Sequence, residues 1–184
     1  MKQIVLASAS PRRRELLHYI TDDFICAVSE ADESGLTLPA PALVCALAER
    51  KAREVLARYP DAVVIGADTV VEVDGKVLGK PKDRAEARRF MQMLSGTTHF
   101  VHTGVCVTDA DQTCTRAAKT AVHFLALDAQ ETEAYLDTDE CWDKAGGYAI
   151  QGTAAKWIDR IEGCYYNVMG LPVSLVNTML KKFF

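Results

Sequence analysis

Apolar and polar positions along this chain form short blocks that predict strands and helices. The run Ile4–Ala7 is apolar and predicts a strand, and a helix over about 11–19 is expected directly after it. Ser10 is suited to cap this helix, because its side chain can accept a hydrogen bond from a free backbone N–H. Pro11 is suited to the first helical position, where its missing N–H costs nothing.

The remaining elements are predicted from apolar runs, helical spacing and turn residues. Strands are expected at 24–28, at 62–66 with extended chain over 69–73, and at 76–78, 98–108, 113–127 and 157–161. Helices are expected at 42–59, 84–94, 129–136 and 173–183. Asp74-Gly75 predicts a hairpin turn, and Asp83 and Asp128 are expected to cap the helices that follow them. The 42–59 helix is indicated by apolar residues that recur near helical spacing, which are Leu43, Ala46, Leu47, Ala52, Val55 and Leu56.

A carboxylate follows the most apolar of these strands. The run Ala62–Gly66 is typical of a strand buried on both faces, and Ala67-Asp68-Thr69 comes directly after it. Burying an unpaired charge is costly, so an Asp at the tip of a buried strand needs a reason. One reason is structural, a turn or a helix cap. The other is functional: a rigid strand holds Asp68 in a cleft, to bind a metal or to accept a proton.

The first helix begins with a cluster of positive charge. Arg12, Arg13 and Arg14 lie in its first turn, where they oppose the helix dipole. A strand, a turn and a helix start with free N–H groups form an anion site, and a bound anion would explain the arginines. The alternative is a solvated basic helix end. Neither glycine-rich phosphate-loop pattern occurs in the chain.

Three further segments are candidates for a site. They are the acidic loop 30–33, Lys80-Pro81, where the proline favours an extended lysine, and 143–152, which contains two adjacent glycines. Each also has a bland interpretation, as a solvated loop or a glycine-rich connection. The strand histidines are expected on the surface or in a satisfied core rather than as metal ligands; they are His99, His102 and His123.

Size and composition restrict the classes of protein. The 184 residues, 49% of them hydrophobic, fit a single domain over 1–184, with or without two lobes. The net charge of -4 argues against a nucleic-acid binder. No apolar run approaches the roughly 20 residues of a membrane span, and the N-terminus does not resemble a signal peptide. We therefore expect a cytoplasmic protein that binds neither membrane nor nucleic acid, with its six cysteines reduced.

The candidate residues suit phosphate chemistry. The chain has no Gly-x-Ser-x-Gly elbow, and no Ser or Cys nucleophile is indicated. Cations beside carboxylates fit hydrolysis by an activated water with a divalent metal, and carboxylates hold Mg²⁺ or Mn²⁺ while substrate phosphate oxygens complete the shell. The polyanion would be met by Arg12, Arg13, Lys51 and Lys80.

Four motifs together resemble those of the Maf family. They are residues 8–13 (Ser-Ala-Ser-Pro-Arg-Arg), 67–69, Lys80-Pro81 and 143–152, in the order of the family, and they lie between residues 4 and 172. The resemblance implies an α/β fold with a long twisted mixed β-sheet and two lobes flanking a central cleft, akin to inosine triphosphate pyrophosphatases. It also implies a nucleoside triphosphate pyrophosphatase that releases a nucleoside monophosphate and pyrophosphate.

The resemblance also implies roles for individual residues. Asp68 corresponds to the proton acceptor, and Glu33 and Asp68 would hold the Mg²⁺ or Mn²⁺ ion. Glu30 and Asp32 are alternatives to Glu33 in the same acidic loop. Positions linked to substrate choice are Arg12, Thr69 and Gln151, and polar positions lining the cleft are Ser8, Arg13, Glu33, Lys51 and Lys80. Asp68-Thr69 and the 147–152 loop resemble the branch that acts on dTTP and UTP, and the 7-methyl-GTP branch differs there.

Two other functions remain as alternatives. One is a nucleotide-binding regulator of septum formation without turnover, the phenotype from which the family takes its name. The other is a pyrophosphatase for purine or modified nucleotides. The expected partner is a nucleoside triphosphate, and a homodimer is possible because relatives commonly form one.

Overall fold

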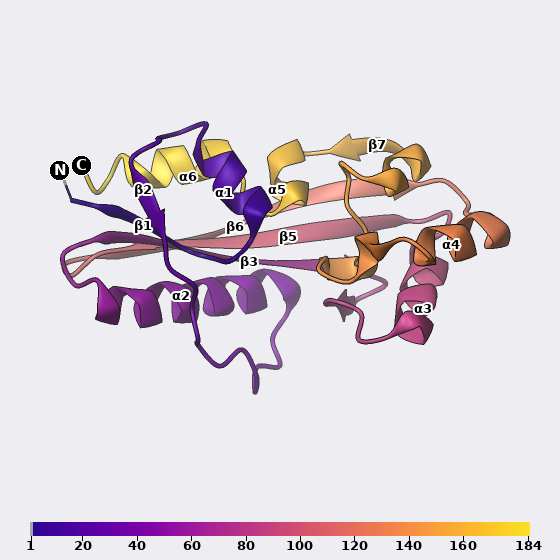
Figure 1. Ribbon diagram of the computed structural model, residues 1–184, viewed down its shortest axis with the longest axis horizontal. Helices are drawn as coiled ribbons and strands as arrows, with labels where there is room; N and C mark the ends of the chain where they lie inside the picture. The colour runs from indigo at the N-terminus through magenta and orange to yellow at the C-terminus, as the bar shows by residue number, and fades with distance from the viewer. Residues whose placement is uncertain (1) are drawn as a thin grey trace. The chain divides into compact units, whose positions relative to one another are not determined.

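The computed structural model describes residues 2–184, over which the chain forms a seven-stranded mixed sheet with helices (Figure 1). Its strands are β1 (Ile4–Ala7), β2 (Phe24–Cys26), β3 (Val63–Val73), β4 (Lys76–Leu78), β5 (Thr98–Thr108), β6 (Thr113–Phe124) and β7 (Ile158–Glu162). The order is β2-β1-β3-β5-β6-β7, and β4 pairs with β3. β1 is parallel to β2 and β3, whereas β4 and β7 are antiparallel to their partners. The predicted α/β class with a mixed sheet is confirmed.

The helices follow the predicted order. They are α1 (Pro11–Leu17), α2 (Ala40–Arg58), α3 (Arg84–Leu94), α4 (Ala129–Leu136), α5 (Tyr165–Met169) and α6 (Val173–Leu180), with 3₁₀ turns η1 (Asp139–Cys141), η2 (Ala145–Gly147) and η3 (Thr153–Trp157). The side chains of Ser10, Asp83 and Asp128 cap α1, α3 and α4 as predicted. α5 and the 3₁₀ turns were not predicted, because each of these segments is too short to show a helical period. Among residues 2–184, no helix combines the length and the apolar content of a membrane span.

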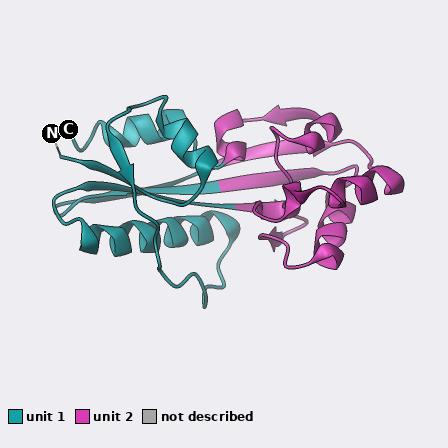
Figure 2. Ribbon diagram, in the orientation of Figure 1, with its two compact units in different colours: residues 1–69, 103–118, 170–184 teal, residues 70–102, 119–169 magenta. Residues whose placement is uncertain are grey.

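The chain divides into two compact units, each built from segments far apart in sequence (Figure 2). Unit 1 consists of residues 1–69, 103–118 and 170–184, and unit 2 of residues 70–102 and 119–169. β3, β5 and β6 contribute residues to both units. The single domain expected over residues 1–184 stays a prediction.

In unit 1, α2 packs on one face of the sheet. Two glycines of the strands set the distance between the helix and the sheet. A methyl group placed on Gly66 of β3 would lie 2.2 Å from the carbonyl oxygen of Ala48, and one on Gly104 of β5 would lie 2.2 Å from that of Val44. The buried face of α2 therefore contains Val44 and Ala48. Of the apolar residues at helical spacing, Leu47, Ala52 and Val55 are buried, whereas Leu43, Ala46 and Leu56 are half-buried. Because these strand positions have no side chain, the backbone of α2 can lie close to the sheet. The face of α2 that is turned toward the two glycines is the buried one.

β3 corrects the expected position of Asp68. The strand runs unbroken through 11 residues from Val63 to Val73, so Asp68 lies in its interior and not at its tip. Successive residues of a strand point to opposite faces. Asp68 accordingly contacts Lys51 on α2, whereas Thr69 contacts Arg13 on α1, at the other face of the sheet (Figure 1).

Unit 2 has its own core, which surrounds buried aromatic side chains. Tyr135 and Tyr148 are nearly inaccessible, and their hydroxyls are hydrogen-bonded to the Gly147 carbonyl (3.0 Å) and to His99 Nε2 (2.7 Å). Burial lowers the pKa of His99 to about 3, so this histidine is neutral at physiological pH. His102 is also buried and bonds Glu72 at 2.7 Å. Both histidines therefore lie in the core as expected, but they are only partly satisfied: Nε2 of each is bonded, whereas Nδ1 of each has no hydrogen-bond partner among residues 2–184.

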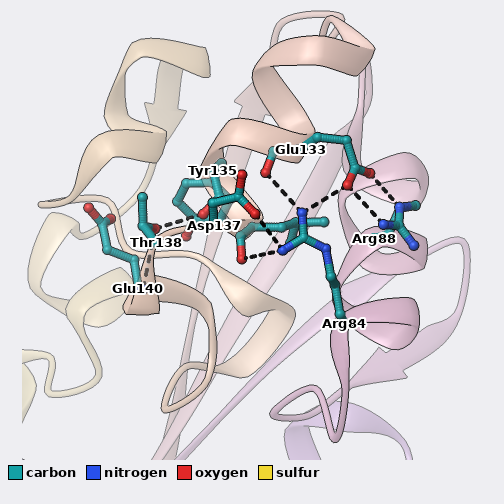
Figure 3. Close-up of polar contacts among 8 residues, drawn as sticks. Arg84, Arg88, Glu133, Tyr135, Asp137, Thr138 and Glu140 are labelled. Carbon is teal, nitrogen blue, oxygen red and sulfur yellow. Dashed lines mark hydrogen bonds and ion pairs between the residues drawn. The ribbon is translucent and has the colours of Figure 1, made fainter.

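Ion pairs join α3 to α4 in this unit. Arg84 lies between Glu133 and Asp137, at 3.0 and 2.7 Å, and Arg88 also binds the Glu133 carboxylate (Figure 3). Arg84 in addition donates to the Leu136 carbonyl at 3.1 Å, which satisfies one of the last free carbonyls of α4. Hydrogen bonds from Arg88 and then Arg84 lower the pKa of Glu133 to about 2, from an ordinary value of 4.5.

This shift predicts how acid affects the unit. A carboxylate with a lowered pKa stabilises the fold above its unfolded pKa and loses that effect as the pH falls toward the folded value. Glu133→Gln is therefore expected to lower the melting temperature at pH 7, and the difference from wild type should disappear between pH 4.5 and about 2. The effect should be small and reduced by salt, because these side chains are well exposed.

Melting curves over this pH range, recorded by circular dichroism, test the expectation. Glu15→Gln is the matched control, since Glu15 is exposed and its side chain has no ion pair within residues 2–184. If Glu133→Gln lowers the melting temperature by the same amount at all pH values, the ion pairs of Glu133 do not set the acid response.

Candidate active site

Asp68 is paired with a lysine from α2. Its carboxylate Oδ1 lies 2.7 Å from Lys51 Nζ, and both side chains are almost buried. The pair supplies the opposite charge that a carboxylate this far buried needs, since an unpaired buried charge is strongly destabilising. The structural alternative for Asp68, a turn or a helix cap, is wrong, because the residue lies inside a continuous strand.

The same lysine contacts one residue of the acidic loop. Glu33 Oε2 lies 3.1 Å from Lys51 Nζ, so a single ammonium bridges two carboxylates. The neighbouring Asp32 is bonded within its own loop: its Oδ1 accepts from the backbone N–H of Ser34, a bond that lowers the pKa of Asp32. The Glu30 backbone N–H donates to Glu54. Of the three acidic candidates, the geometry favours Glu33 as the residue that lies beside Asp68.

Arg13 is held from three sides by groups of unit 1. Its guanidinium donates to the carbonyl of Gly170 (2.8 Å), to the carbonyl of Ala67 (2.9 Å) and to Thr69 Oγ1 (3.0 Å). Burial lowers the pKa of Arg13 and the charge of Arg12 adds to this, while Asp68 and Glu33 raise it. An arginine nevertheless stays protonated in proteins, so a fixed positive charge lies within electrostatic reach of both carboxylates.

The turn before α1 is fixed by two serines. Ser8, which is buried, accepts a hydrogen bond from the Ser10 backbone N–H at 3.1 Å, and Ser10 in turn caps the helix. Arg12 is half-buried in the first turn, beside Arg13. The predicted combination of a capped helix start and basic side chains therefore exists next to the Asp68 pair.

Lys80 and Gln151 belong to unit 2, whereas the residues described above belong to unit 1. Both side chains are exposed, and neither has a hydrogen bond or ion pair within residues 2–184. Their loops are joined, because the Gly146 N–H donates to the Gly79 carbonyl at 2.9 Å. Their position relative to Asp68 stays a prediction.

The first of the paired glycines in this loop, Gly146, lies close to strand β3. Gly146 has φ of +70°, and a methyl group on it would lie 2.7 Å from a Val71 methyl group of β3. The close approach expected from the sequence is therefore explained by packing. It provides no evidence for a ligand at Gly146, and the interpretation as a tightly packed connection applies to this position.

One site residue was not found from the sequence. Thr103 of β5 is fully buried, and its Oγ1 lies 2.9 Å from Thr69 Oγ1. The only signal in the sequence is a hydroxyl among apolar neighbours in a strand, which is too common to single it out.

Glu33 and Asp68 are the two carboxylates that the resemblance assigns to a divalent cation. Within residues 2–184, no group of three or more His, Cys, Asp or Glu side chains is arranged to hold a metal. Glu33 and Asp68 nevertheless converge on one cationic nitrogen, that of Lys51, so their oxygens can share a small cation. Mg²⁺ is commonly held by one or two carboxylates together with substrate phosphates and water. Carboxylates are the donor type that such an ion takes, and the metal-binding role of Glu33 and Asp68 stays a prediction.

The chain is similar along its whole length to proteins that carry one name. Two proteins named dTTP/UTP pyrophosphatase, from Symbiobacterium thermophilum and Pelotomaculum thermopropionicum, are each 50% identical over the whole chain, which covers 95% and 97% of them. A third protein of that name, from Bacillus cytotoxicus, is 45% identical, with 100% of this chain and 96% of the relative covered.

A solved structure shows the same fold. The Ham1 protein of Staphylococcus aureus matches with a TM-score of 0.53 over 100% of both chains, at 13% sequence identity. At this identity the likeness is one of fold alone. The family model described as Maf-like protein matches residues 3–183, and the chain therefore belongs to the Maf family.

Proposed function

We propose that this protein hydrolyses dTTP and UTP to the nucleoside monophosphate and pyrophosphate. The observation that carries the reaction class is the pair Asp68 and Glu33, bridged by Lys51 beside a basic helix start. The relatives, which share up to 50% identity over the full chain and carry the name dTTP/UTP pyrophosphatase, support the choice of substrate. A cytoplasmic location and a homodimer stay predictions.

Asp68 is the proposed proton acceptor. A carboxylate fixed on a rigid strand can orient a water and take its proton as the water attacks the α-phosphate. Its bond to Lys51 at 2.7 Å holds one oxygen in place and leaves the other for the water. Glu33 and Asp68 would together hold Mg²⁺ or Mn²⁺, which when bound would neutralise phosphate charge.

The basic residues divide between binding and positioning. Arg12 and Lys80 are proposed to contact the phosphates, together with the Ser8 turn and Lys51. Arg13 has three hydrogen bonds to protein groups, so it positions Thr69 and the 67–69 segment, while its charge still favours an anion nearby. Thr69 and Gln151 are proposed to select the base, since their side chains offer donors and acceptors.

A nucleotide panel tests the proposal. Purified protein is incubated with Mg²⁺ or Mn²⁺ and dTTP, UTP, CTP, ATP, GTP, ITP or 7-methyl-GTP, and the products are separated by ion-exchange chromatography. We expect TMP or UMP with pyrophosphate, and turnover of dTTP and UTP well above that of the purine nucleotides. Orthophosphate with a nucleoside diphosphate would contradict attack at the α-phosphate. Tight nucleotide binding without turnover would instead favour the regulator.

A further inference from the structure

The site contains a buried hydroxyl that the proposed chemistry does not use. Thr103 of β5 is fully buried, and its Oγ1 lies 2.9 Å from Thr69 Oγ1. On its other side, Thr69 Oγ1 lies 3.0 Å from Arg13 Nη2. Thr69 itself is only half-buried. Hydrogen bonds from two neighbouring elements thus meet on the one hydroxyl that is proposed to read the substrate base.

The remaining hydrogen-bonding capacity of Thr69 follows from counting. A hydroxyl has one proton and two lone pairs, and a guanidinium can only donate. Arg13 therefore takes one lone pair of Thr69. The bond to Thr103 takes either the proton of Thr69 or its second lone pair. If Thr69 donates to Thr103, Thr69 can only accept a hydrogen bond from a ligand. If Thr103 donates to Thr69, Thr69 can only donate its proton to a ligand.

We propose that Thr103 is a specificity-determining positioning residue, which donates to Thr69 and thereby leaves the Thr69 proton for the substrate. The inference rests on the proposed function. Uracil and thymine carry a carbonyl acceptor at C4, where cytosine carries an amino donor. A Thr69 hydroxyl that can only donate therefore binds uracil and thymine and rejects cytosine.

The surroundings hold this arrangement rigidly. Arg13 is fixed by the carbonyls of Ala67 and Gly170, so its bond to Thr69 cannot move without breaking two others. Gly170 has φ of +107°, and a methyl group there would lie 3.4 Å from Thr69 Oγ1 and 3.5 Å from Arg13 Nε. Backbone and guanidinium therefore leave Thr69 little freedom apart from rotation of its proton, and that rotation is what Thr103 controls.

The test is the preference for UTP over CTP in full-length protein. Thr103→Val keeps the shape of the side chain and removes the hydroxyl, so the Thr69 proton can rotate. The ratio of kcat/KM for UTP to that for CTP should fall about tenfold, the equivalent of one hydrogen bond. Most of the change should lie in KM, because Thr103 does not touch the reacting atoms. Thr103→Ser should restore the wild-type ratio.

The controls separate this inference from the proposed function. If wild type hydrolyses neither UTP nor dTTP, the proposed function and the inference both fail. If wild type prefers UTP and Thr103→Val keeps the same ratio, the inference alone is overturned. An equal loss with both nucleotides in the Val and Ser variants would indicate a packing role and overturn it too. Should Thr103→Val not fold, as judged by its melting temperature, Thr103→Ala is measured in the same way.

Discussion

Replacement of Asp68 by asparagine should lower kcat with dTTP or UTP on the order of 100-fold or more, with little change in KM. The amide has the shape of the carboxylate but cannot accept the proton of the attacking water. It also cannot share in holding a cation with Glu33. The loss should therefore appear in turnover, since the basic residues that bind the phosphates are unchanged.

Two controls separate chemistry from folding. Asp61→Asn makes the same change at an exposed residue before β3 and should leave kcat unchanged. Since Asp68 is paired with Lys51 at 2.7 Å, the folded fraction of Asp68→Asn must be checked by melting curves, although Glu33 still neutralises the lysine. Near-normal turnover of a folded Asp68→Asn protein would show that Asp68 is not the proton acceptor.

Gly66→Ala should destabilise the protein by about 3 kcal/mol, the upper part of the range for overpacking a core. The added methyl group would lie 2.2 Å from the Ala48 carbonyl oxygen and 2.9 Å from the Cβ and backbone N of Ala52. Both contacts are on α2 and include backbone, so no side-chain rotation relieves them. The helix must move away from β3, and Lys51, on the same helix, would move away from Asp68.

Urea unfolding followed by circular dichroism measures this change as a lower midpoint. Gly79→Ala is the matched control, because an added methyl group there has no heavy atom within 4 Å, and its midpoint should stay near that of wild type. A Gly66→Ala protein as stable as wild type would contradict the close packing of α2 against β3. If its stability falls, activity should also fall, through the displaced Lys51.

Local features were predictable from the sequence. The three helix caps and the Asp74-Gly75 turn depend on groups a few residues apart, and the structure has both turn residues at positive φ, +49° and +71°. The four motifs and their order identified the family, which the family model confirms over residues 3–183. β2 ends before the predicted Val28: β1 stops at Ala7, so no β1 residue lies opposite Val28, and Ala27 bonds β1 only through its N–H to the Leu6 carbonyl.

The sequence by itself determined the caps, the turn, the order of elements and the residue types of the site. Only the tertiary structure decided which of those residues meet. Lys51 meets Asp68 across 17 positions of the chain, and Arg13 meets Gly170 across 157, because α2 and α1 pack on opposite faces of one sheet. The role of Thr103 and the continuity of β3 through Asp68 likewise follow from strand pairing. Local periodicity predicts the elements, but the register between elements depends on contacts that are distant in sequence.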